Sequence, residues 1–184
     1  MTSPVLYLFA GCNGAGKTTF AKAYLTSLPG PPRFLNADEI ARGLSPFDPA
    51  SMARKAGKLL LGEIDDCIEA GRSFGLESTL SGRAQLGVIE RAKTRGYQVE
   101  IHYLWIPSPE LAIRRITQRV RMGGHFVPDA DVIRRYQRSL GNFVNLYAPL
   151  ADAWVLWDNT LKPPGLLLES SSASLNQLRA RLIP

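Results

Sequence analysis

Gly11-Cys12-Asn13-Gly14-Ala15-Gly16-Lys17-Thr18 is the most informative segment of this sequence. It matches the phosphate-binding pattern G-x-x-x-x-G-K-[ST], and Thr19 follows it directly. The pattern needs a strand before it and a helix after it. Residues 5–10 form a continuous apolar run, which is typical of a buried parallel strand. After Lys17, apolar residues recur at helical spacing, at Phe20, Ala21, Tyr24 and Leu25. This context favours a working site over a chance match in a glycine-rich turn.

The segment has the chemistry of a nucleoside triphosphate site. Its glycines let the backbone turn tightly, so that several N–H groups point into one concavity and bind phosphate oxygens. A helix that starts near Gly16 adds the positive end of its dipole. We expect Lys17 to reach the β- and γ-phosphates of ATP, and the Thr18 hydroxyl to bind Mg²⁺. The predicted cofactor-binding residues are Gly11, Cys12, Asn13, Gly14, Ala15, Gly16, Lys17, Thr18 and Thr19. We interpret Cys12 as a small filler residue, not as a nucleophile.

Length and composition indicate one globular domain over residues 1–184, with 45% apolar and 21% charged residues. No apolar run reaches membrane-spanning length, and no signal peptide is recognisable at the N-terminus. The two cysteines, Cys12 and Cys67, do not make a disulfide framework, so we expect a reduced, cytoplasmic setting. The net charge of +6 fits either nucleic acid or a small, strongly anionic ligand.

Apolar runs of strand length alternate with amphipathic helical segments along the chain. Besides residues 5–10, we expect strands at residues 33–36, 74–76, 97–106 and 153–157, with an edge-strand candidate at 166–168. Helices are expected at about 49–71 and 82–95, and from about 109 and 129 onward. This alternation predicts an α/β fold with a mostly parallel, five-stranded sheet flanked by helices.

Two carboxylates follow predicted strands, at the edge of the sheet where ligands bind. Asp38 is placed to orient an acceptor hydroxyl and take its proton. Alternatively, Asp38 caps the helical turn at residues 39–42, and the two roles are compatible. Glu77 is placed to hold Mg²⁺ or a substrate hydroxyl, because a carboxylate that ends a buried strand needs a partner. One of the hydroxyl residues that follow it is expected to cap the next helix: Ser78, Thr79 or Ser81.

Arginines cluster on both sides of a glycine-rich break, Gly123-Gly124-His125-Phe126-Val127-Pro128. Two basic helices joined by a flexible turn indicate a small helical lid over about residues 109–147. In phosphoryl transfer, a closing arginine stabilises charge on the moving phosphoryl group. We expect most of these arginines to be ordinary surface charges and two or three to act in the reaction. They are Arg114, Arg115, Arg119 and Arg121 before the break, and Arg134, Arg135 and Arg138 after it.

Five segments in this order resemble the motifs of the zeta-toxin-like family of P-loop kinases, in its compact bacterial branch. They are residues 11–18, Asn36-Ala37-Asp38, Glu77-Ser78-Thr79-Leu80-Ser81-Gly82, residues 123–128 and Arg134-Arg135-Tyr136. The resemblance runs from about Val5 to Asn159. It implies a P-loop NTPase fold and the phosphorylation of a small-molecule hydroxyl with ATP and Mg²⁺. In the best-known members the acceptor is a UDP-N-acetyl sugar. An antitoxin partner is associated with such toxins, but nothing in this chain indicates one.

The resemblance also implies roles for single residues. Lys17 and Thr18 would hold ATP and Mg²⁺, and Asp38 would be the general base. The implied substrate-binding residues are Asp38, Arg42, Glu77 and Thr79, with Glu77 also a metal candidate. The candidates for charge stabilisation are Arg119, Arg121 and Arg134. The chain is shorter than the toxins that give the family its name, so the reaction class transfers more readily than the sugar.

Other functions stay open at this point. The acceptor could instead be a nicotinamide dinucleotide, a nucleotide or an antibiotic. A nucleotide-binding switch is a rival of another class, although the Asn-Lys-x-Asp motif of a GTPase is absent from the sequence. A third rival function is that of an inactive binding scaffold. The presence of Lys17, Thr18 and Asp38 argues against it. Nucleic acid is disfavoured as a partner, because the sequence shows no separate basic stripe with interleaved aromatic residues.

Overall fold

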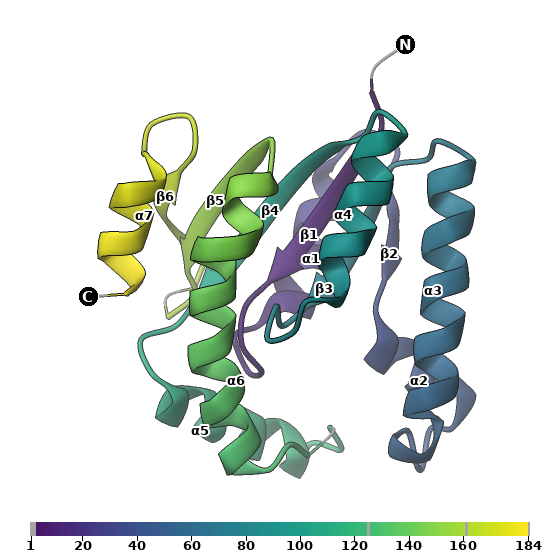
Figure 1. The fold of residues 1–184 in the computed structure, drawn as a ribbon. Coiled ribbons are helices and arrows are strands. Elements are labelled where there is room, and N and C mark those ends of the chain that lie inside the picture. The colour runs from purple at the N-terminus through teal and green to yellow at the C-terminus, as the bar shows by residue number, and fades with distance from the viewer. Residues whose placement is uncertain (1–2, 125, 161, 184) are drawn as a thin grey trace.

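The computed structural model describes residues 3–124, 126–160 and 162–183. In these residues six strands form one sheet, in the order β2-β3-β1-β4-β5-β6 (Figure 1). The strands are β1 (Val5–Ala10), β2 (Arg33–Leu35), β3 (Phe74–Ser78), β4 (Gln98–Trp105), β5 (Ala153–Asp158) and β6 (Gly165–Glu169). Strands β1 to β5 are parallel, and β6 pairs with β5 in antiparallel orientation. The predicted number of five strands was wrong by one, because the edge-strand candidate does join the sheet.

Helices cover both faces of the sheet. They are α1 (Lys17–Ser27), α2 (Ala37–Leu44), α3 (Ala53–Glu69), α4 (Ala84–Thr94), α5 (Pro109–Arg121), α6 (Asp129–Asn142) and α7 (Leu175–Leu182). Two 3₁₀ turns, η1 (Ala50–Met52) and η3 (Ala148–Leu150), and one π-helical segment, η2 (Phe143–Tyr147), accompany them. Figure 1 shows α3, α4 and α6 on the near face and α1 behind the sheet. None of the helices in the described residues is long and apolar enough to cross a membrane.

The alternation of side chains along β1 explains why the sheet needs helices on both faces. Leu6, Leu8 and Ala10 lie in the large core cluster together with residues of α3 and α4. Phe9 belongs to a separate cluster with Ala21 and Leu25 of α1. Burying both faces of β1 fixes it as a central strand, so its carboxyl end and the phosphate-binding segment lie near the middle of the sheet edge.

The parallel register brings the candidate site residues to one edge. Ala10, the last residue of β1, is paired with Ser78 of β3 and with Tyr103 of β4. The chain leaves β1 toward β3 and β2 on one side and continues with β4 and β5 on the other. Ligands bind beyond the strand ends at such a switch point in open α/β sheets. In Figure 1, α2 and α5 lie at this same end of the sheet.

Helices α5 and α6 are the two helices for which the sequence predicted a small lid, and we call them the lid helices. Gly123 adopts a φ of +82°, and the Gly124 N–H donates to the Arg119 carbonyl at 2.9 Å. This is how a glycine ends a helix and reverses the chain. The second lid helix begins at Asp129, as predicted.

The predicted capping of α4 by a hydroxyl residue was wrong. Arg83 is the N-cap residue and makes no side-chain capping bond. The hydroxyls are used inside the loop instead: Ser78 Oγ accepts from the Leu80 N–H at 3.1 Å, and the Thr79 and Ser81 hydroxyls lie 2.9 Å apart. The expected helix over residues 49–71 begins as the 3₁₀ turn η1 and continues as α3.

Candidate active site

The loop between β1 and α1 fits tightly against the start of the lid. A Cβ on Gly14 would lie 2.7 Å from the Ala112 carbonyl oxygen, and one on Gly11 would lie 2.5 Å from the Leu104 carbonyl oxygen. Both glycines also have positive φ, +77° and +138°. The loop therefore needs glycine for two reasons, conformation and close approach. The Ala15 N–H closes its turn by donating to the Cys12 carbonyl at 3.2 Å.

These contacts predict a loss of nucleotide binding in Gly14→Ala. Gly71→Ala is a matched control, because Gly71 has a φ of +62° but no atom near the added Cβ. The left-handed backbone should cost both variants about 1–2 kcal/mol of unfolding free energy, measured in urea. Only Gly14→Ala should weaken ATP binding, about tenfold or more, because its loop must move away from the phosphates. Equal ATP affinity of the two variants, measured by calorimetry, would contradict the role assigned to Gly14.

Four polar side chains form one network at the carboxyl ends of β1, β2 and β3. Glu77 Oε2 accepts from the Thr18 hydroxyl at 2.8 Å and from Asn36 Nδ2 at 2.7 Å. Lys17 Nζ lies 3.7 Å from Glu77 Oε1 and donates to the Cys12 carbonyl at 3.0 Å. The Lys17 side chain is 6% exposed and that of Glu77 14%. A buried ammonium and a largely buried carboxylate thus lie close together, and each compensates the charge of the other.

The donors at this point fit Mg²⁺. The metal prefers hard oxygen ligands, and in nucleotide sites it takes one or two from the protein and the rest from phosphates and water. The Thr18 hydroxyl and the Glu77 carboxylate are such a pair, already in contact. The described residues hold no cluster of three or more histidine, cysteine or acidic side chains that could bind a metal without phosphate.

Asp38 lies in the first turn of α2, and its side chain is exposed. Asn36 caps this helix, because its Oδ1 accepts from the N–H groups of Asp38 and Glu39. The alternative in which Asp38 itself is the cap was therefore wrong. Within the described part of the chain, the Asp38 carboxylate makes no hydrogen bond or ion pair. Arg42 follows four residues later, on the same side of α2, and is also exposed.

The other predicted substrate and lid residues lie outside the network. The Thr79 hydroxyl is occupied by Ser81 and contacts neither Glu77 nor Lys17. Arg119 and Arg121 are in the last turn of α5 and are exposed. Arg134 of α6 forms an ion pair with Asp131 at 2.7 Å, on its own helix. The structure therefore places these three arginines on α5 and α6, outside the network of Lys17, Thr18, Asn36 and Glu77.

One lid arginine that was not among the predicted site residues is linked to this loop through Asn159. Arg115 Nη2 donates to the Asn159 carbonyl at 2.8 Å, and Asn159 Nδ2 donates to the Ala15 carbonyl at 2.5 Å. Arg115 lies one helical turn after Ala112, whose carbonyl faces Gly14. The sequence alone gives no signal for this contact, because the side of α5 that packs against Gly14 is known only from the structure.

Cys12 is a filler residue, as its position in the loop suggested. It is buried, and this burial raises the pKa of its thiol to about 11, despite the opposing effect of Lys17. At neutral pH the thiol is protonated and therefore a poor nucleophile.

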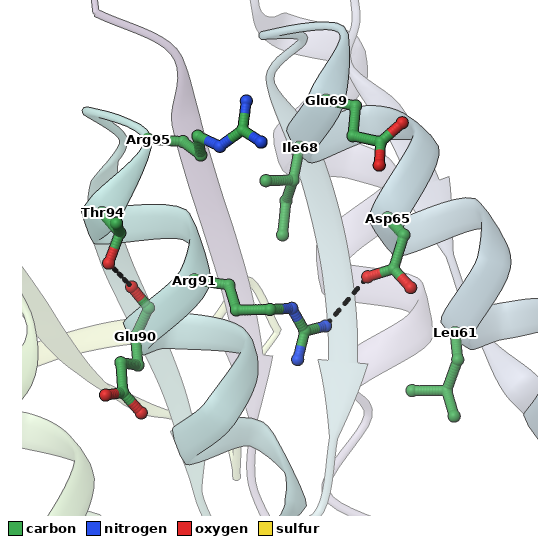
Figure 2. A pocket seen from close by; sticks show the side chains of 8 residues that line it. All are labelled: Leu61, Asp65, Ile68, Glu69, Glu90, Arg91, Thr94 and Arg95. Atoms are coloured by element: carbon green, nitrogen blue, oxygen red, sulfur yellow. Dashed lines mark hydrogen bonds and ion pairs between the residues drawn. The ribbon is translucent and has the colours of Figure 1, made fainter.

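A hollow of about 690 Å³ lies between α3 and α4, away from the network around Glu77 (Figure 2). Arg91 of α4 crosses it and forms an ion pair with Asp65 of α3 at 3.0 Å. The side chains that line it are mostly exposed and carry both charges. We therefore interpret the hollow as a solvated groove between two helices, not as a catalytic site.

Comparison with known proteins agrees with this arrangement. The zeta toxin family model matches residues 1–149. The chain belongs to this family. An uncharacterised protein of Haemophilus influenzae is 31% identical over 128 residues, which cover 70% of this chain and 89% of that protein. Membership of the zeta toxin family supports an ATP-dependent kinase activity.

Solved structures show the same fold at low sequence identity. One comes from the PezAT chromosomal toxin–antitoxin system of Streptococcus pneumoniae, with a TM-score of 0.78 and 15% identity. It covers 97% of this chain and 78% of that one. The AvrRxo1-ORF1:-ORF2 complex with ATP gives a TM-score of 0.69 and 18% identity, covering 98% of this chain and 63% of that one. Similarity at this level shows the P-loop kinase fold and nothing finer.

Proposed function

We propose that this chain transfers the γ-phosphoryl group of ATP to a hydroxyl of a small molecule, and that the acceptor is a UDP-N-acetyl sugar. One observation supports this type of reaction above all: Lys17, Thr18 and Glu77 lie in contact at the edge of the sheet. Asp38 lies at the same edge, in the first turn of α2. A phosphate-binding cation, a metal-binding pair and an unpaired carboxylate are the groups that phosphoryl transfer to an alcohol requires. The sugar is supported only by the family, and ATP also by the ATP-bound AvrRxo1 complex.

In this proposal Asp38 orients the acceptor hydroxyl and takes its proton as the oxygen attacks the γ-phosphorus. The bond from that phosphorus to the β,γ-bridging oxygen breaks, and ADP leaves. Lys17 turns from the Cys12 carbonyl toward the β- and γ-phosphates and neutralises charge there. Thr18 and Glu77 would hold Mg²⁺, which supplies further charge neutralisation on the phosphates. Arg42 and Thr79 are proposed for the acceptor, and Arg119, Arg121 and Arg134 for the closed lid.

The setting of the reaction is part of the proposal. We take residues 1–184 as a single kinase domain with a lid at about residues 109–147. Two buried, unpaired thiols and the use of ATP suit the cytoplasm. An antitoxin is proposed as a partner from the PezAT toxin–antitoxin system alone.

An acceptor screen tests the substrate. Purified protein with Mg²⁺ and ATP is incubated with UDP-N-acetyl sugars, other nucleotide sugars, nicotinamide dinucleotides and representative antibiotics. Mass spectrometry then looks for the gain of one phosphate. We expect a phosphorylated UDP-N-acetyl sugar. Phosphate on another acceptor would replace the sugar and keep the reaction, whereas ATP binding without any phosphorylated product would overturn both.

A further inference from the structure

Asn36 is one of the few buried polar residues in the described part of the chain, with 6% exposure. Both ends of its amide are used. Nδ2 donates to Glu77 Oε2 at 2.7 Å, and Oδ1 accepts from the Asp38 N–H at 2.8 Å and, at 3.4 Å, from the Glu39 N–H. The opposite orientation of the amide would place its oxygen against a carboxylate and its NH₂ group against two N–H groups. The environment therefore fixes a single orientation.

This one side chain joins two parts of the site that come from different elements. On one side it holds the carboxylate that also accepts from Thr18. On the other it caps α2, the helix that carries Asp38 in its first turn. A serine or aspartate would serve as well for the cap alone. Only a side chain with a donor atom and a separate acceptor atom at the reach of an amide can serve both parts.

We propose that Asn36 is a positioning residue that holds the Glu77 carboxylate beside Thr18 and, through the same amide, fixes the turn of α2 that carries Asp38. The first arm of this proposal, the placement of Glu77, needs only nucleotide and Mg²⁺ binding. The second arm, the placement of Asp38 on α2, rests on the proposed function. Groups that orient a metal ligand in this way commonly change metal affinity by one to two orders of magnitude when they are removed.

The experiment separates the two arms with two substitutions. Asn36→Ser keeps an acceptor for the cap, but its hydroxyl is one bond shorter than the amide and falls short of the place of Nδ2 beside Glu77. Asn36→Ala loses both contacts. The readout is the binding of a fluorescent ATP analogue during a titration with Mg²⁺. We expect the Mg²⁺ concentration at half-saturation to rise about tenfold in both variants. Only Asn36→Ala should also show a clearly lower midpoint of thermal unfolding, because it alone lacks the cap.

A second pair of proteins shows whether the effect passes through Glu77. In a Glu77→Ala background the partner of Asn36 Nδ2 is gone, so adding Asn36→Ser should change the half-saturation by less than about twofold. Wild-type Mg²⁺ dependence in Asn36→Ser, with loss only in Asn36→Ala, would reduce Asn36 to a cap and overturn the first arm. A tenfold effect that persists without Glu77 would overturn it as well.

The second arm is tested by turnover, with the acceptor that the screen identifies and with Mg²⁺ at saturating concentration. Asn36→Ala should then lose more of kcat than Asn36→Ser, because only the alanine variant frees the turn that holds Asp38. Equal kcat in the two variants would overturn this arm. If no acceptor is phosphorylated by the wild-type protein, the proposed function fails, while the Mg²⁺ titration still decides the first arm.

Discussion

Asp38→Asn should lower kcat of phosphoryl transfer by about 10²–10⁴-fold, the usual contribution of a general base. The substitution keeps the size of the side chain and removes its ability to take a proton. Asp38 is exposed and has no partner among the described residues, so neither the fold nor the ATP site depends on its charge. We therefore expect unchanged ATP affinity, measured by calorimetry, beside the loss of turnover.

Glu39→Gln is the matched control for this variant. Glu39 is the next residue on α2, is also acidic, and forms an ion pair with Lys22 of α1 at 2.5 Å. Both variants remove one negative charge from the same turn, so a general electrostatic effect on the site would appear in both. Full turnover in Asp38→Asn, or an equal loss in the two variants, would show that Asp38 is not the base.

Lys17→Met should lower kcat/KM by about 10²–10³-fold, because a preorganised donor to the transferred phosphoryl group is lost. Methionine replaces most of the buried lysine stem, so packing around the 6% exposed side chain is largely kept. The ammonium that faces Glu77 disappears, however. Affinity for ATP should therefore fall together with turnover, which distinguishes this variant from Asp38→Asn.

Lys22→Met controls for the loss of one positive charge on α1. Lys22 is 57% exposed, and its ion pair with Glu39 is a surface pair of the kind that contributes little. Steady-state kinetics should give nearly wild-type values for this control. Wild-type kinetics in Lys17→Met would instead show that Lys17, and with it the loop that carries it, does not act in phosphoryl transfer.

The sequence predicted those parts of the fold that depend on local patterns. The apolar runs of β1, β4 and β5 and the Ser108 cap of α5 are encoded in neighbouring residues, and the structure shows them where they were expected. The sequence predicted β6 only as an edge-strand candidate, because its apolar run of three leucines is short and an edge strand has only one partner, here β5.

The contacts within the site could be predicted only in part. The glycine pattern located Lys17 and Thr18, and strand ends located Glu77, because parallel strands bring their carboxyl ends to one edge. The double role of Asn36 could not be read from the sequence, since its partner Glu77 is 41 residues away and on another strand. A cap by Asp38 and a cap by Asn36 fit the local sequence equally well, and only the structure shows that Asn36 is the cap.

The lid shows the same limit. Arginines on a helix face many directions, and which of them reaches the loop depends on how α5 packs against Gly14. That packing turns Arg115 toward Asn159 and leaves Arg119 and Arg121 exposed in the last turn. The acidic Asp131 pairs with Arg134 in this structure, a contact between residues three positions apart that any helix permits.

The fate of the γ-phosphoryl group tests the central claim most directly. ATP labelled with ¹⁸O in that group is incubated with the protein, Mg²⁺ and a small-molecule extract, with Asp38→Asn in parallel, and the label is followed by mass spectrometry. We predict that it appears in a phosphomonoester of a small molecule and is absent from that product in Asp38→Asn. Label found only in inorganic phosphate, or retained in ATP that is bound but not consumed, would contradict the assignment of this chain as a small-molecule kinase.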